Sequence, residues 1–463
     1  MKPDQAWQPY TPSAENPWDL AKVGHLYRRA GFGPTMAELE RGLADGPEKT
    51  IQRLLTGQPA DPDFEAASEF MADERSLPAG SDATQLAAWW LARILHNPHP
   101  FREKLALFWH NHFATSLAKV RNARFMLGQY RLLYEHALGD FRQLLKAITT
   151  DPAMMIWLDT VTSRKGQPNE NYARELMELF SLGIGHYTET DIREAARAFT
   201  GYTIRDGVAH FDPKQHDAGE KTVLGQTGRW KAEDIVRICL EQPACPRFIV
   251  GKLYRAFVSE AEPPTPEFLE PLAQLYRRCG FNTATVIETI FRSQWFFSPA
   301  AYRQRIKSPV EFVVGIVRGL EGRVGTLPLA DALAALGQLL FSPPSVKGWD
   351  GGPAWLNAQT LLYRQNLALA ITSTEDSRFG RRCDPAALLQ KHLRNGDAEA
   401  IDFFLTLFLQ NDLPAESLQK LRDYAVSSRQ HRFPKYWTES DIREHRWRTL
   451  AYLTLTIPEF QLA

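Results

Sequence analysis

Apolar residues recur with a helical spacing along most of the chain. In residues 101–113, for example, the side chains of Phe101, Leu105, Phe108 and His112 fall on one stripe of a helix. Similar segments follow one another up to residue 372 and return toward the C-terminus. This spacing predicts a mainly α-helical globular protein, with a helix content well above the average of about 30–35%.

One segment breaks the helical period. Residues 202–211 read as two short strands, and the pair Asp206-Gly207 between them suits a type I′ turn. We therefore expect a small β-hairpin near residues 201–212, followed by a loop to Arg229. A central sheet of four or more strands would contradict this fold class.

Local signals mark where several elements begin and end. Asn16 is a suitable N-cap for a first helix that ends near Arg29, and Thr188 with Asp191 predicts a capping box. The polar stretch 61–82 is expected to be a loop with a helical turn. A chain of 463 residues exceeds one ordinary core, so we expect a main helical domain at 1–373 and a C-terminal helical part at 374–463 packed on it.

A stripe of polar side chains lies beside the apolar face of the helix predicted for residues 170–182. Asn171, Arg174, Glu175 and Glu178 recur at i, i+3, i+4 and i+7. Carboxylates beside a guanidinium suit metal binding or acid–base catalysis, but they equally suit a solvated face or an interhelical salt-bridge network. Glu175 is closest to the apolar face, so we expect it to be buried and paired with Arg174 or His112.

Two histidines, His110 and His112, end the helix predicted for residues 101–113. On a regular helix they diverge by about 200°, so both cannot face one ion. His112 shares the apolar stripe and should point inward, either as a core histidine or as a site group. Both are kept as candidate metal ligands.

A polar loop follows the predicted hairpin and contains His216 and Asp217. Irregular backbone on a rigid scaffold is a common place for a site, and histidine with carboxylates suits Zn, Mn or Fe. The spacing matches no established metal signature, since there is no HExxH pair. A solvated polar loop is the alternative.

The segment from Pro343 to Trp355 is rich in proline, glycine and tryptophan. Trp349 and Trp355 could form an aromatic floor for a sugar or peptide, although such tryptophans more often pin a loop to a helix. Sequence motifs of serine hydrolases and of nucleotide-binding proteins are absent.

Composition narrows the classes of function. Lys plus Arg and Asp plus Glu both number 54, so nucleic-acid binding gains no support from net charge. No apolar run reaches the about 18–20 residues that a membrane helix needs. Four scattered cysteines are typical of reduced, structural thiols. Residues 1–14 lack a hydrophobic signal segment, so a cytoplasmic location is the default, with export left open.

Several stretches in this order resemble the bacterial domain-of-unknown-function family 1800. They are His25–Thr35, Glu103–Thr115, Asn169–Phe180, Tyr187–Glu189, His216–Gly219, Pro343–Trp355 and Pro458–Gln461. The resemblance implies no established reaction. It implies an exported protein, but residues 1–14 lack the signal segment that export would need. It also implies a protein partner from family 1501, whose members look like sulfatases and phosphatases.

Two functions stay open at this point. The first is a metal- or carboxylate-dependent hydrolase, with Glu175, Glu178, His112 and Arg174 as catalytic groups. Its divalent metal would be held by ligands from the set His110, His112, Glu175, His216 and Asp217. The second is a non-catalytic helical scaffold or maturation partner for another protein. Convergence of these side chains would favour the enzyme, and salt bridges closed on themselves would favour the scaffold.

Overall fold

Helices make up 60% of the chain, which confirms the mainly α-helical class. The computed structural model describes residues 2–59, 61–73, 75–379, 382–427 and 433–463. Within these ranges the strands form only two separate antiparallel pairs. No helix in the described ranges is both long and apolar enough to cross a bilayer.

The first part of the chain contains ten helices among its described residues. They are α1 Pro3–Ala6, α2 Leu20–Ala30, α3 Met36–Thr56, α4 Pro62–Met71, α5 Ala83–His96, α6 Pro100–His112, α7 Leu117–Val120, α8 Ala123–Glu135, α9 Phe141–Thr149 and α10 Pro152–Trp157. Two of them correct our expectations. Asp19, not Asn16, caps α2, because its carboxylate accepts the Lys22 N–H at 2.9 Å. The expected loop 61–82 begins with α4, which Asp61 caps.

The middle of the chain carries both hairpins. Its elements are the 3₁₀ turn η1 Thr160–Thr162, α11 Asn171–Glu175, the π-helical turn η2 Leu176–Ser181, α12 Glu189–Ala198, β1 Tyr202–Arg205, β2 Val208–Phe211, β3 Lys221–Val223, β4 Gln226–Gly228, α13 Ala232–Glu241, α14 Ala244–Phe257, α15 Pro266–Arg278 and α16 Thr283–Arg292. The β1–β2 hairpin turns at Asp206 and Gly207, both with positive φ, as predicted. The expected loop after it contains a second hairpin, β3–β4.

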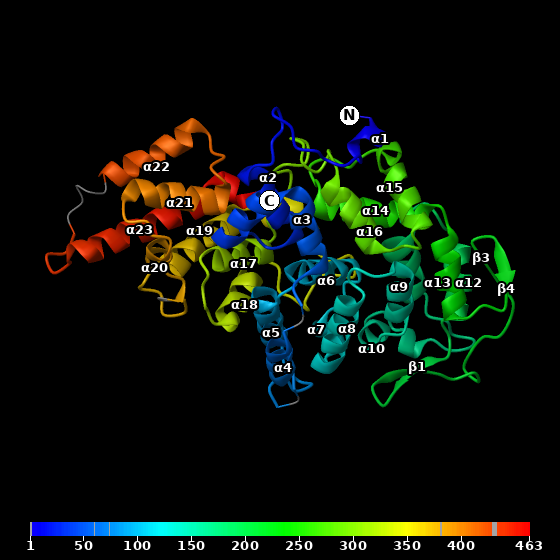
Figure 1. Ribbon diagram of the computed structural model, residues 1–463. Coiled ribbons are helices and arrows are strands. Elements are labelled where there is room, and N and C mark those ends of the chain that lie inside the picture. Colours follow the sequence, from blue (N-terminus) through cyan, green and yellow to red (C-terminus); the bar gives the residue numbers. More distant parts are fainter. Residues whose placement is uncertain (1, 60, 74, 380–381, 428–432) are drawn as a thin grey trace.

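The last elements gather on one side of the molecule, opposite the hairpins (Figure 1). They are α17 Pro309–Gly319, α18 Thr326–Ala335, the 3₁₀ turn η3 Gly352–Trp355, α19 Ala358–Thr372, α20 Pro385–Lys391, α21 Asp397–Leu409, α22 Ala415–Ser427, α23 Glu439–Thr456 and the 3₁₀ turn η6 Pro458–Gln461. Helix α23 packs on both α19 and α21, so it contacts each of the two expected domains. The division at residue 373 stays a prediction, and residues 380–381 of the expected linker lie outside the described residues.

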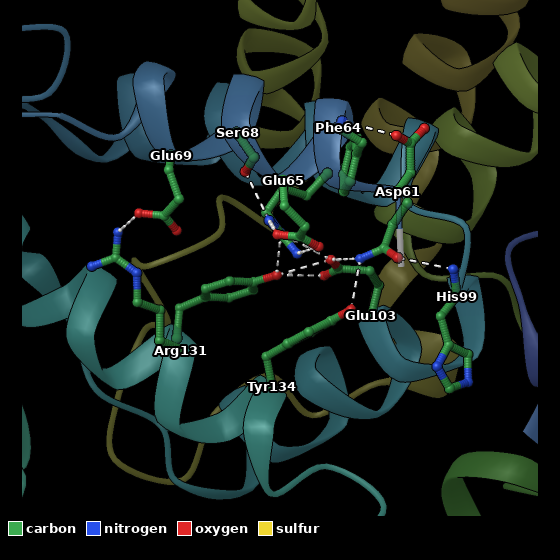
Figure 2. Close-up of polar contacts among 12 residues, drawn as sticks. Asp61, Phe64, Glu65, Ser68, Glu69, His99, Glu103, Arg131 and Tyr134 are labelled. Carbon is green, nitrogen blue, oxygen red and sulfur yellow. Dashed lines mark hydrogen bonds and ion pairs between the residues drawn. The ribbon is translucent and has the colours of Figure 1, made fainter. Parts of the chain in front are cut away.

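A polar network centred on the buried Glu103 joins α4, α5, α6 and α8, and reaches the surface at Glu65. We call it the Glu103 network, and its members are Glu65, Arg93, Asn97, Glu103 and Tyr130. The fully buried Glu103 carboxylate accepts hydrogen bonds from Asn97 Nδ2 (2.6 Å), Tyr130 OH (2.8 Å) and Arg93 Nε (3.2 Å). Figure 2 shows Glu65 and Glu103 directed into this centre. Burial raises the pKa of Glu103, and Arg93 opposes that shift.

Candidate functional site

The end of α6 contacts segments that are far apart in the sequence. Burial lowers the pKa of His110 to about 3, so its neutral Nε2 accepts the Phe341 N–H at 3.2 Å. Asn111 accepts the Trp349 N–H at 2.7 Å and donates to the carbonyl of the same residue at 3.3 Å. Gly348 is at φ +83°, and a Cβ there would lie 2.3 Å from the Asn111 side-chain oxygen. These contacts fasten the 341–349 loop to α6.

His112 points into the core, as its apolar stripe predicted. Its side chain is 4% exposed, and its Nε2 donates to the Phe180 carbonyl at 3.1 Å. Burial, with Lys252 nearby, holds its pKa well below the ordinary range. His112 is therefore a neutral imidazole whose buried Nδ1 has no hydrogen-bond partner within the described residues.

The predicted helix 170–182 changes its hydrogen-bonding pattern at Leu176. In η2 the Leu182 N–H bonds the Met177 carbonyl at 2.9 Å, a π-helical step. The carbonyls of Leu179 and Phe180 accept instead from Lys252 Nζ (3.0 Å) and from His112. π-turns of this kind are frequent at functional sites. Here the turn joins α11 to α6 and α14.

The polar stripe on α11 and η2 is largely paired with nearby groups. Arg174 donates to both Glu189 oxygens, at 2.8 and 2.9 Å, and to Glu170 at 3.3 Å. The Tyr187 hydroxyl donates to Glu178 at 2.7 Å. This geometry is that of an interhelical salt-bridge network, which was one of the two alternatives for the stripe.

Glu175 differs from its neighbours on the stripe. Its carboxylate is about half-buried and makes no hydrogen bond or ion pair within the described residues, so the expected pairing with Arg174 or His112 is not formed. Burial and the adjacent Glu178 raise the pKa of Glu175, and Arg174 opposes them. Glu175 is thus a partly buried carboxyl group with a raised pKa and no direct partner.

The predicted loop residues His216 and Asp217 are held by the C-terminal end of α12. Nδ1 of His216 donates to the Thr200 carbonyl at 3.0 Å. Asp217 accepts from Arg197 at 2.8 and 3.2 Å, and this ion pair lowers the pKa of Asp217 to about 2. Both side chains therefore fix the loop to the helix.

The structure brings some predicted site residues together and separates others. His112 reaches the η2 turn that carries Glu178, but Arg174 is paired at Glu189 and Asp217 at Arg197. Those anchors are eight residues apart on α12, which is about 12 Å along its axis. Among the described residues no three His, Cys, Asp or Glu side chains are placed to hold a metal ion. The metal-ligand assignment stays a prediction without geometric support.

Among the small cavities at the surface are two, of which one borders the predicted loop. This cavity, of about 220 Å³, is lined by Val161, Ser163, Arg164, Gly201, Tyr202, Thr203, Asp212 and Gln215. The other, of about 210 Å³, lies between α2 and α3, beside Tyr27 and Arg53. Both are smaller than the about 300–1,000 Å³ typical of ligand pockets. Sequence reasoning found the loop side of the first cavity and missed residues 161–164 on its other side.

Residues 25–462 match the family described as Protein of unknown function (DUF1800). The chain belongs to this family. No curated protein and no solved structure matches the chain. The DUF1800 resemblance found in the sequence is therefore confirmed across nearly the whole length.

Several of the stretches that resemble DUF1800 lie at joints between distant elements of this fold. In the first, His25 Nε2 donates to the Phe296 carbonyl at 3.0 Å. In the last, the Gln461 carbonyl accepts the Lys307 N–H at 2.8 Å. With the α6 contacts to Phe341 and Phe180, these stretches connect segments that are separated by tens to hundreds of residues.

Proposed function

We propose that this DUF1800 protein is a non-catalytic helical scaffold that binds another protein. One observation carries the proposal: apart from Glu175, the predicted catalytic and metal-binding side chains have hydrogen-bond partners within the fold. His110, His112 and His216 bond backbone groups, while Arg174 and Asp217 form ion pairs. Polar side chains that are hydrogen-bonded or ion-paired inside the protein stabilise its fold.

The partner we propose is a phosphatase- or sulfatase-like protein of family 1501, following the resemblance. The test is co-expression of both proteins, followed by size-exclusion chromatography and assay of phosphate- and sulfate-ester hydrolysis. We expect a stable complex, with hydrolysis by the partner alone or by the complex and none by the DUF1800 chain. Absence of a complex would refute this partner. Both the cytoplasmic default and the exported alternative stay predictions.

A hydrolase is the second candidate, and the unpaired Glu175 favours it. A carboxyl group with a raised pKa beside a second carboxylate is the arrangement used for general acid–base catalysis. In this role Glu175 would donate or accept the proton, and Glu178, held by Tyr187, would stay ionised beside it. The geometry supports no step through a metal ion.

The test of the hydrolase is an assay of the purified chain against phosphate, sulfate and carboxylate esters. Glu175→Gln should abolish any turnover, and Glu170→Gln, on the same segment, should leave it unchanged. Elemental analysis of the same sample provides the second readout. A stoichiometric metal, or turnover that Glu175→Gln removes, would contradict the scaffold proposal.

A further inference from the structure

Six cationic side chains are gathered in the interior near Glu311. All but Arg28 interact with the Glu311 carboxylate, and Arg28 acts on Arg29 and Lys307. Five of the six are at most 6% exposed, and the side chain of the sixth, Arg305, is 11% exposed. They come from α2, α6, the segment before α17, and α19. We call them the cation cluster: Arg28, Arg29, Lys104, Arg305, Lys307 and Arg364.

The carboxylates that face the cation cluster are few and already engaged. Glu311 pairs with Lys104 and with Arg305 (3.1 Å), and it accepts the Ser308 N–H at 2.7 Å. Glu260 accepts the Ile306 N–H at 2.7 Å and lies 3.9 Å from Arg305 Nε. Asp412 acts on Arg28 as well, and it is also paired with Arg303 at 3.3 Å. Three carboxylates thus face six cationic side chains, and buried charge without a counter-charge is costly.

Several guanidinium nitrogens of the cluster have no acceptor within the described residues. They are Nε and Nη2 of Arg28, Nε and Nη1 of Arg29, and Nε of Arg305 and of Arg364. Arginine cannot lose its proton to escape this cost. Each unmade bond of a buried charged donor is therefore a lasting penalty, unless an acceptor from outside the chain provides it.

The remaining contacts tie members of the cluster to nearby backbone and to one another. Arg29 donates to the Ala301 carbonyl at 2.8 Å, and Arg364 donates to the Lys307 carbonyl at 2.8 Å. Lys307 lies over the Phe460 ring, and burial, with Arg28 and Arg364 nearby, holds its pKa well below the ordinary range. Like charges from four segments thus act on one another in a region closed to water.

We infer that the cation cluster is a binding site for a small tetrahedral oxyanion, phosphate or sulfate. Planar guanidinium groups match oxyanions through paired, charge-assisted hydrogen bonds. One tetrahedral group has enough oxygen acceptors to satisfy several of these donors at once.

The experiment uses the purified full chain in two steps. First, the protein is exchanged into chloride buffer and unfolded in acid, and the released ions are measured by ion chromatography, where we expect roughly one phosphate or sulfate per chain. Second, the melting temperature is measured with inorganic phosphate, with sulfate and with chloride at equal ionic strength. Phosphate or sulfate should raise it, and the larger shift identifies the preferred ion.

A matched pair of variants separates this site from general stabilisation by salt. Arg29→Lys keeps the charge and removes unpaired guanidinium donors, so the phosphate concentration for half the shift should rise roughly tenfold. Arg93→Lys makes the same change at a buried arginine that is fully paired in the Glu103 network, and it should leave the phosphate effect unchanged. If Arg29→Lys does not fold, Arg364→Lys replaces it.

Three results would overturn the inference. They are no released oxyanion together with equal melting temperatures in phosphate, sulfate and chloride; the same phosphate response in Arg29→Lys as in the parent; and an equal loss in Arg93→Lys. Each result would mean that the positive charges of the cation cluster are compensated by groups of the chain itself and not by a bound oxyanion.

Discussion

The Glu103 network and the cation cluster are both buried, charged and built from several helices, yet they differ in how their charges are compensated. In the Glu103 network every nitrogen of the Arg93 guanidinium donates to Glu65, Glu103, Ser68 or Tyr130. In the cation cluster, Arg29 makes a single hydrogen bond within the described part of the chain, to the Ala301 carbonyl. Burial of charge alone therefore does not identify a site; the decisive observation is which donors lack an acceptor.

The largest expected loss of stability comes from removing the central carboxylate of the Glu103 network. Glu103→Leu would leave Arg93 buried without its innermost carboxylate, and we expect a loss of about 3–5 kcal/mol in the free energy of unfolding. Urea denaturation measures it. A loss below about 1 kcal/mol would mean that this network is no tighter than a surface ion pair.

A smaller loss in the free energy of unfolding is expected in the cation cluster, where carboxylates are already few. Glu311→Gln removes the carboxylate that pairs with Lys104 and Arg305 in the cation cluster, and it should cost about 2–4 kcal/mol in chloride buffer. Phosphate should restore part of this loss if the cluster binds an oxyanion, and it should restore nothing to Glu103→Leu. Denaturation curves of both variants in the two buffers make the comparison.

The ion pair between Asp217 and Arg197 lies outside both clusters, and breaking it should reduce the free energy of unfolding less than either of the two changes above. Asp217→Asn breaks the partly exposed pair with Arg197, whose side chains are 27% (Arg197) and 22% (Asp217) exposed, and should cost about 0.5–1 kcal/mol at pH 7. Because the pKa of Asp217 is lowered to about 2 in the folded state, its stabilisation is present above the ordinary pKa of about 3.9. The difference between parent and variant should therefore shrink as pH falls from about 4 to 2.

The smallest effect should have the opposite sign. Glu175 has a raised pKa and no direct partner, so ionising it disfavours the folded state. This destabilisation appears as pH rises above the ordinary value of about 4.3 and through the raised one. Glu175→Gln should thus stabilise the protein by a few tenths of a kcal/mol at pH 7 and make no difference at pH 3. Destabilisation at pH 7 would reveal a partner for this carboxylate.

Several elements were readable from short stretches because their signals are local. The Thr188–Asp191 capping box and the Asp206-Gly207 turn each depend on residues within four positions of one another. The second hairpin escaped because it turns at Leu224-Gly225, and leucine at positive φ (+49°) is not a typical turn signal. The cap of α2 was misplaced by three residues because Asn16 and Asp19 are equally good candidates by residue type.

The sequence by itself determined where most helices lie, that a hairpin interrupts them, and that His112 faces inward. The tertiary structure alone decided which polar groups meet. His112 finds the Phe180 carbonyl 68 residues away, and Lys104 finds Glu311 across 207 residues. Helix periodicity and capping act between near neighbours, and so they are written in short stretches of sequence. The partner of a buried charge depends on how distant segments pack, which no local pattern records.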